Sequence, residues 1–202
     1  MLNHLLSWAI WLPIFAGIIV ALIGSNGARA NIARWVALFG AIASFLVTLP
    51  LFSGFDRLNG GMQFTELASW IPALGLNYHL GVDGISVLFV ILNAFTTVLV
   101  VLAGWQVIQK KPAQYFAAFL IMSGLINGAF SALDAILFYA FFEGMLIPMY
   151  LIIGVWGGPR RVYASIKFFL YTLLGSLLML VALIYLSRLT GGSFAILDMQ
   201  AI

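Results

Sequence analysis

Long apolar runs, separated by short polar stretches, dominate the pattern along this chain. The runs are close to the roughly 20 residues that a helix needs to cross a bilayer, and they lack the alternation of apolar and polar positions that is typical of barrel strands. The pattern therefore predicts six transmembrane helices, over residues 5–23, 32–52, 84–108, 115–130, 135–155 and 163–186. The connections agree, because glycine, proline and charged residues gather in GSNGARAN, QKKPAQ and WGGPRR.

The second connection, residues 53–83, is longer than the others. Within it, LNYHL at 76–80 alternates weakly and predicts a short strand. Asp83 directly precedes the third predicted helix, which we expect to begin at Gly84. We interpret Asp83 as an N-cap rather than as a catalytic acid.

The first apolar run has a second interpretation, as a cleaved signal peptide, because ARA at 28–30 resembles a cleavage site between small residues. No Lys or Arg precedes the run, the run is long, and Arg29 occupies the middle of that site. We therefore expect a retained transmembrane helix.

Cations and acids are distributed unequally between the two sides of the predicted bundle. Connections one, three and five contain or adjoin six cations: Arg29, Arg34, Lys110, Lys111, Arg160 and Arg161. The other side holds most of the acids, with two cations: Asp56, Glu66, Asp83, Asp134, Asp198, Arg57 and Arg188. By the positive-inside rule, the N-terminus is predicted to be extracytoplasmic and connections one, three and five cytoplasmic.

Composition excludes several classes of protein and of functional site. With 64% hydrophobic and 7% charged residues, it has too little polar surface for a water-soluble globule, which predicts an all-α polytopic membrane protein. The absence of cysteine excludes disulfides, Cys-ligated metal sites and Cys nucleophiles. The two histidines, His4 and His79, lie in different segments, so a metal site is not indicated. The net charge of +3 follows from membrane topology and does not indicate nucleic acid.

The fifth predicted helix carries one acid, Glu143, inside FYAFFEGMLIPMY at 138–150. It lies roughly 12 to 18 Å from either helix end, too deep for its side chain to reach water, and a charge there costs about 3 kcal/mol. Pro148 has no N–H for the carbonyl of Gly144, and Tyr139 lies one turn away.

Burial raises the pKa of a carboxyl group and a nearby cation lowers it, so an acid in this place can exchange protons near neutral pH. We predict a proton-handling site; the alternative is an acid that only joins two helices through a hydrogen bond.

Lys167, in YASIKFFLYTLLGS at 163–176, is the second charge inside a predicted helix. It lies about 9 Å beyond Arg161, so its long side chain can snorkel to the cytoplasmic interface or take a buried role. Tyr163 and Tyr171, each one turn away on the same face, favour a polar interior stripe.

Weaker candidates are polar but uncharged or lie at a helix end. Asn93, Ser123 and Asn127 are expected to form hydrogen bonds between helices, with lining of a proton path as the alternative. Asp134 precedes the fifth helix and is predicted to be its N-cap, with a proton-exit role as the alternative.

Three blocks carry a resemblance to a known family: GVDGIS at 81–86, FFEGMLIPMYLIIGVWGG at 141–158 and KFFLYTLLGS at 167–176. Together they resemble the chain M family of antiporter-like subunits of proton-pumping NADH:quinone oxidoreductase, respiratory complex I. The resemblance covers nearly the whole chain in consistent order, and FFE followed by LIPMY and WGG is fairly specific to chain M.

The resemblance implies a proton-translocating membrane subunit of this enzyme. Glu143 matches the family's buried glutamate on the fifth helix, and Lys167 matches the lysine of its KFF block on the sixth. The resemblance further implies that this chain holds no redox cofactor, since NADH, FMN, iron–sulfur clusters and quinone belong to other subunits. The implied partners are neighbouring antiporter-like membrane subunits, the lipid bilayer and protons, in a bacterial plasma membrane. The loop before Asp83 would correspond to an extracytoplasmic hairpin.

Length is where the chain departs from this family, whose members carry about fourteen helices built from inverted repeats. The sequence stops just after the sixth predicted helix, before the family's seventh-helix lysine, so we expect an N-terminal fragment. Residues 1–112 would form a three-helix region with the extracytoplasmic loop 53–83, and residues 113–202 the start of the first repeat. The alternatives are a related subunit of a multisubunit cation/proton antiporter or membrane-bound hydrogenase, and a purely structural bundle.

Overall fold

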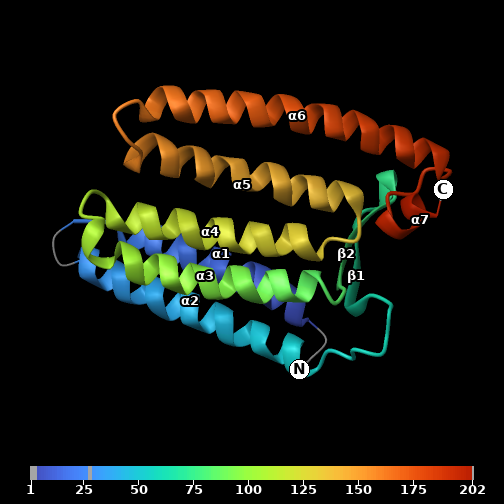
Figure 1. Ribbon diagram of the computed structural model, residues 1–202, viewed down its shortest axis with the longest axis horizontal. Helices are drawn as coiled ribbons and strands as arrows, with labels where there is room; N and C mark the ends of the chain where they lie inside the picture. The colour runs from blue at the N-terminus through green and yellow to red at the C-terminus, as the bar shows by residue number, and fades with distance from the viewer. Residues whose placement is uncertain (1–3, 27–28, 202) are drawn as a thin grey trace.

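The computed structural model describes residues 4–26 and 29–201, and its six long helices confirm the predicted transmembrane architecture (Figure 1). All six are long and apolar enough to cross a membrane: α1 Leu5–Ile23, α2 Arg29–Ser53, α3 Ser86–Val107, α4 Pro112–Ser131, α5 Ala135–Trp156 and α6 Arg161–Leu189. Residue 28, part of the possible cleavage site, lies outside the described residues.

The helix ends differ from the predicted ends where polar residues continue a helix beyond its apolar run. Helix α2 begins at Arg29, three residues before the predicted start, and α6 extends from Arg161 to Leu189. Helix α4 begins at Pro112, because proline at the first helical position has the required φ and lacks only an N–H that would have no partner there. Hydropathy identifies the apolar part of a helix, which lies in the lipid. The ends of the helix depend instead on its backbone hydrogen bonds and can lie beyond the apolar part.

The helices lie side by side, with their connections gathered at two opposite ends (Figure 1). Helix α1 packs most extensively against α4, α3 packs on α2 and α4, and α5 lies between α4 and α6. The α1–α4 contact needs small residues, since a Cβ on Gly124 would lie 2.4 Å from the backbone oxygen of Ile10. Glycine here lets two helix backbones approach closely, as is common in membrane bundles.

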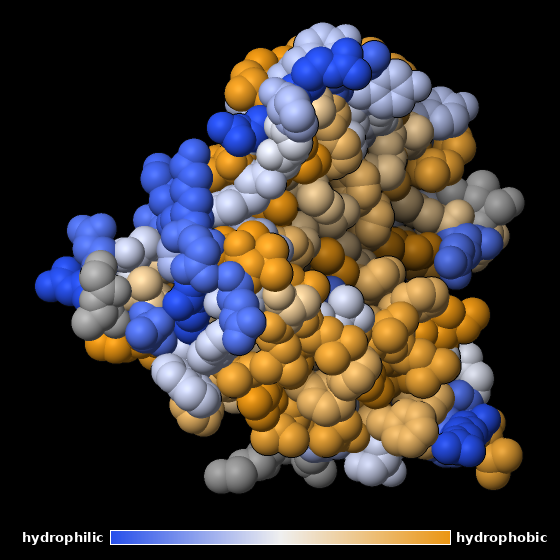
Figure 2. Space-filling model, turned by 60° about the vertical axis from the view of Figure 1, so that its left-hand side comes forward, coloured by the Kyte–Doolittle hydropathy of each residue, from blue (hydrophilic) through white to orange (hydrophobic). Residues whose placement is uncertain are grey.

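Large apolar side chains cover much of the outer surface. Figure 2 shows wide hydrophobic areas on one face, with hydrophilic residues gathered in patches. Exposed residues of this kind occur along whole helices, including Trp8 and Phe15 on α1, Phe39 on α2 and Leu178 on α6. A surface this apolar suits lipid or a neighbouring protein rather than water.

A small layer of paired backbone closes one end of the bundle. Strand β1 (Gln63–Ile71) pairs antiparallel with β2 (Leu76–Val82), through the 3-10 turn η1 (Pro72–Leu74). The connection between α4 and α5 continues this pairing, as Leu133 N–H donates to the His79 oxygen at 2.8 Å and Ala135 N–H to the Phe194 oxygen at 2.8 Å. Short helix α7 (Ile196–Gln200) follows at the same end.

This layer confirms the strand predicted for LNYHL and the hairpin implied by the resemblance. Strand β1 was not predicted, because QFTELASWI has no clear alternation and becomes a strand through its pairing with β2.

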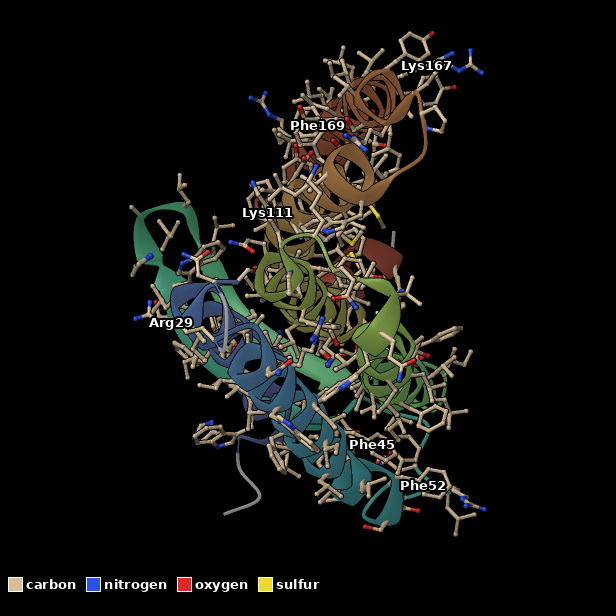
Figure 3. The ribbon with its side chains drawn as sticks, turned by 90° about the vertical axis from the view of Figure 1, so that its left-hand side faces the viewer. Arg29, Phe45, Phe52, Lys111, Lys167 and Phe169 are labelled. Atoms are coloured by element: carbon tan, nitrogen blue, oxygen red, sulfur yellow. The ribbon has the colours of Figure 1, made fainter. Side chains whose placement is uncertain are left out.

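The charged residues separate between the two ends in space as they do along the chain. Connections α1–α2, α3–α4 and α5–α6 lie at one end, and the hairpin, the α4–α5 connection and α7 lie at the other (Figure 1). Figure 3 faces the first end, where Arg29 and Lys111 lie.

Candidate functional site

Glu143 lies at the contact between α5 and α6, far from both ends of α5. Its side chain is half-buried, and its Oε1 accepts a hydrogen bond from the hydroxyl of Ser176 on α6. The phenol of Tyr139 lies beside both Glu143 and Ser176. Pro148 occupies a buried position five residues further along α5, without interrupting the helix. The site therefore places an acid and two hydroxyl groups together inside the apolar bundle.

The face of α6 that meets α5 carries a row of buried serines. Ser165, Ser176 and Ser187 are the buried residues of α6 and recur every eleven residues. Eleven residues are close to three whole turns, so these side chains share one face of the helix. Near the other end of the contact, a Cβ on Gly154 would lie 3.2 Å from the Ser165 hydroxyl. Small residues therefore bring α5 and α6 together, and Ser176 is the serine that meets the acid.

Lys167 lies on another side of α6 from this row. Its side chain is exposed, and its Nζ lies 5.8 Å from the ring centroid of Tyr163 (Figure 3). Tyr163, Lys167 and Tyr171 line an open hollow on this side, so they share a face as the sequence predicted. Within the described residues that face is open, and the structure does not bring Lys167 and Glu143 together. In residues 4–26 and 29–201, the one ion pair joins His4 to Glu66.

A second polar cluster joins α1, α3 and α4. The Asn93 side-chain amide donates to the Ser123 carbonyl at 2.9 Å and to Asn127 Oδ1 at 2.7 Å, and Asn127 donates to the Ala9 carbonyl at 2.9 Å. The Thr97 hydroxyl donates to Ser123 Oγ at 2.8 Å. The predicted hydrogen bonds between helices are confirmed, and each ties one helix to another inside the bundle.

Asp134 is the N-cap of α5, as the sequence predicted. Asp134 Oδ1 accepts from the N–H groups of Ile136 and Leu137 at 2.9 and 3.1 Å, and Oδ2 accepts from Asn77 N–H at 3.2 Å, which ties β2 to the start of α5.

Asp83 Oδ1 accepts from Ser86 N–H at 2.7 Å and from Ile85 N–H at 3.1 Å. Helix α3 begins at Ser86, two residues after the predicted start at Gly84, and its N-cap is Ile85. The prediction of Asp83 as the N-cap is therefore wrong: its carboxylate holds the turn that precedes the helix. The hydrogen bond from the Ser86 backbone is the main cause that holds the pKa of Asp83 below its usual value.

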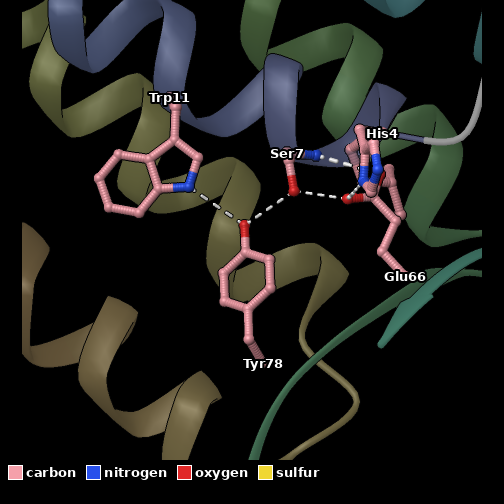
Figure 4. A network of polar contacts seen from close by, with 6 residues as sticks. His4, Ser7, Trp11, Glu66 and Tyr78 are labelled. Carbon is pink, nitrogen blue, oxygen red and sulfur yellow. Dashed lines mark hydrogen bonds and ion pairs between the residues drawn. The ribbon is translucent and has the colours of Figure 1, made fainter. Parts of the chain in front are cut away.

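The sequence analysis missed the role of Glu66, which it placed among the acids of a loop. Glu66 on β1 is only 6% exposed, and its Oε1 accepts from Leu6 N–H at 2.8 Å and Ser7 N–H at 3.2 Å, at the start of α1 (Figure 4). His4 Nδ1 lies 3.6 Å from Oε2. Glu66 therefore caps a helix that begins about sixty residues earlier, which no local pattern indicates.

Three further side chains extend the contact of Glu66 along α1 (Figure 4). Trp11 Nε1 donates to the Tyr78 hydroxyl at 3.2 Å, Tyr78 and Ser7 hydroxyls lie 3.1 Å apart, and Ser7 donates to Glu66 Oε2 at 2.5 Å. Burial raises the pKa of Tyr78, so its neutral phenol, which can donate, persists to higher pH than in water. This network fastens the hairpin to α1.

Metal-binding groups do not gather in the part of the chain that the structure describes. No three His, Asp or Glu side chains of residues 4–26 and 29–201 lie close enough to hold a metal ion.

Two sequence families match the chain. The family described as NADH-ubiquinone oxidoreductase chain 4, amino terminus, matches residues 8–130, and the family described as NADH:quinone oxidoreductase/Mrp antiporter, TM, matches residues 132–202. NADH-quinone oxidoreductase subunit M of Rhodobacter capsulatus is 49% identical over 94% of this chain, and NADH-ubiquinone oxidoreductase chain 4 of Arabidopsis thaliana is 42% identical over 92%. The chain spans 37% of the length of these two curated relatives.

Solved structures share the fold. A chain of respiratory complex I from Thermus thermophilus superposes with a TM-score of 0.81 at 33% identity, over 100% of this chain and 39% of that one. A chain of the archaeal membrane-bound sulfane sulfur reductase gives a TM-score of 0.82 at 18% identity, over 98% of this chain and 40% of that one. The six-helix arrangement of this chain is therefore similar to part of a membrane subunit of complex I.

Proposed function

Because the chain belongs to the family of NADH-quinone oxidoreductase subunit M and chain 4 proteins, we propose that it forms the first part of a proton-translocating subunit of an NADH:quinone oxidoreductase. The observation that carries the proposal is Glu143, an acid held by Ser176 between two apolar helices. An acid placed inside a membrane bundle is costly and is typical of a proton or ion path.

In this proposal the chain moves protons and transfers no electrons. Glu143 takes up and releases a proton at its carboxyl group, next to the hydroxyl groups of Tyr139 and Ser176. NADH oxidation and quinone reduction, with FMN and iron–sulfur clusters, belong to other subunits of the complex. Its partners are neighbouring antiporter-like membrane subunits, and its substrate is the proton.

We assign Lys167 a second place in proton translocation, outside direct contact with Glu143. The relatives are longer than this chain, and the open side of α6 that carries Lys167 is where we place the rest of such a protein. An ammonium group covered there would favour negative charge on groups near it and would respond to their protonation.

We assign the cation-rich end to the cytoplasm and the hairpin end to the opposite side, in a bacterial plasma membrane. The supporting observation is the position of the six cations at the end formed by connections α1–α2, α3–α4 and α5–α6. Within this arrangement, residues 1–112 form the three-helix region with the hairpin, and residues 113–202 begin the first antiporter-like repeat.

Deletion and complementation test the function. Removing the gene region for this chain from a bacterium that encodes it is expected to abolish NADH-driven acidification of inverted membrane vesicles, measured by quenching of an acridine dye, and the whole gene should restore it. Acidification by ATP hydrolysis in the same vesicles is the control. Loss of Na⁺/H⁺ exchange with intact NADH-driven acidification would support the antiporter alternative instead, which the Mrp description of the second family favours.

Orientation can be tested with single cysteines, because this chain contains none. Gly60, before the hairpin, and Gly158, between α5 and α6, are exposed and have open space where the Cβ of a larger residue would lie, so cysteine fits at either place. An impermeant thiol reagent is expected to label Gly60→Cys in intact spheroplasts and Gly158→Cys in inverted vesicles. Labelling with the opposite sidedness would contradict the assignment.

A further inference from the structure

We propose that Ser176 is a positioning residue for Glu143, which holds the carboxyl group in both of its protonation states and stabilises the ionised one more than the neutral one. The inference rests on the proposed role of Glu143. Ser176 is 3% exposed, and its hydroxyl has two acceptors in reach: Glu143 Oε1 on α5 and the carbonyl of Leu173 at 2.9 Å on its own helix.

One hydroxyl hydrogen cannot serve both acceptors fully, and this gives the contact two states. When Glu143 is ionised, Ser176 donates its hydrogen to the carboxylate. When Glu143 is protonated, the acid hydrogen can be donated to Ser176 Oγ, and the Ser176 hydrogen turns to the Leu173 carbonyl. No heavy atom has to move, because a hydroxyl rotates about its C–O bond.

The ionised state gains more from this contact than the neutral one. Hydrogen bonds to an ionised group are roughly twice as strong as those between neutral groups, and more so away from water. Ser176 therefore lowers the free-energy cost of a negative Glu143 inside the bundle. Tyr139 lies beside the same two groups. Tyr150 lies two turns further along the same face of α5 and packs against Phe169 of α6.

The test uses Ser176→Ala in the full-length subunit within its assembled complex. We expect NADH-driven proton translocation to fall several-fold at neutral pH and its pH profile to move to higher pH, because loss of a donor disfavours the ionised acid. Ser176→Thr keeps a hydroxyl and should retain the wild-type profile. Ser176→Cys donates weakly and should give an intermediate shift; it replaces Ser176→Ala if that variant fails to assemble.

Ser165 provides a matched control on the same face of α6. It is buried, and its hydroxyl donates to the carbonyl three residues earlier, Val162, at 3.0 Å, as Ser176 does to Leu173. Ser165→Ala removes the same hydroxyl as Ser176→Ala, and Ser165→Thr adds the same methyl group as Ser176→Thr. Neither change alters a contact of Glu143, so both should leave the pH profile of proton translocation unchanged.

Two results would overturn the inference: an unchanged pH profile in Ser176→Ala, or an equal shift in Ser165→Ala, which would indicate altered helix packing. Infrared difference spectra provide a direct readout, since the C=O stretch of protonated Glu143 should change in Ser176→Ala and not in Ser165→Ala. Normal proton translocation by a Glu143→Gln variant would instead contradict the proposed function of Glu143. Failure of the Ser176 inference and failure of the proposed function therefore give different results.

Discussion

Glutamine in place of Glu143 is expected to reduce NADH-driven proton translocation by at least about tenfold in the full-length protein, with the complex still assembled. Glutamine keeps the size of the side chain and one oxygen that can accept from Ser176, so the α5–α6 contact survives. It cannot bind or release a proton in this pH range, and a positioned acid–base group typically contributes about 10²–10⁴-fold to a proton-transfer rate. Dye quenching in inverted vesicles measures the loss, and native gels measure assembly.

Glu143→Asp is the matched control for this experiment. It keeps an ionisable group but withdraws it by one methylene from Ser176, so partial activity is expected. Wild-type proton translocation in an assembled Glu143→Gln complex would contradict the assigned role and leave the acid as a hydrogen-bonded link between α5 and α6.

Alanine in place of Glu66 is expected to lower the free energy of unfolding by about 2–4 kcal/mol. The change removes the acceptor of Leu6 N–H, Ser7 N–H and the Ser7 hydroxyl, and each buried donor left without a partner costs about 1–3 kcal/mol, partly offset by water at this end. A chain of this size loses about 2–4 °C in Tm per kcal/mol, so a decrease of roughly 5–15 °C is expected. Thermal unfolding of the detergent-purified protein measures it.

Asp56→Ala is the control for a lost acid at the same end. Asp56 is exposed, and its carboxylate accepts from a nearby backbone group, Leu58 N–H at 2.9 Å, so its loss should change stability by no more than about 0.5 kcal/mol. Glu66→Gln keeps an acceptor for the N–H groups of α1, so its Tm should lie between those of Glu66→Ala and Asp56→Ala. Equal Tm values for Glu66→Ala and Asp56→Ala would show that Glu66 does not hold the hairpin to α1.

Several features of this protein followed from neighbouring residues alone. The six helices were predictable because a membrane helix satisfies its own backbone hydrogen bonds and needs only a long apolar run. Asp134 was predictable as a cap, because it accepts from residues two and three positions ahead. Glu143 stood out because a single acid in such a run is costly wherever the helix packs.

Contacts between distant residues decided the rest. Hydropathy does not fix how an almost uniformly apolar helix is rotated about its axis, so the sequence did not indicate which residue of α6 meets Glu143. Packing through the serine face of α6 turned Ser176 toward the acid and left Lys167 on an open side.

Contacts between distant residues also explain why the sequence did not predict strand β1 or the role of Glu66. The strand exists through its pairing with β2, and Glu66 is buried because that pairing places it over the start of α1. The sequence by itself determined the number of membrane-spanning helices, their approximate ends and the one acid deep inside them, since these depend on local free energies. Tertiary structure alone decided which side chain meets that acid and which acid caps α1, because these depend on how separate segments pack.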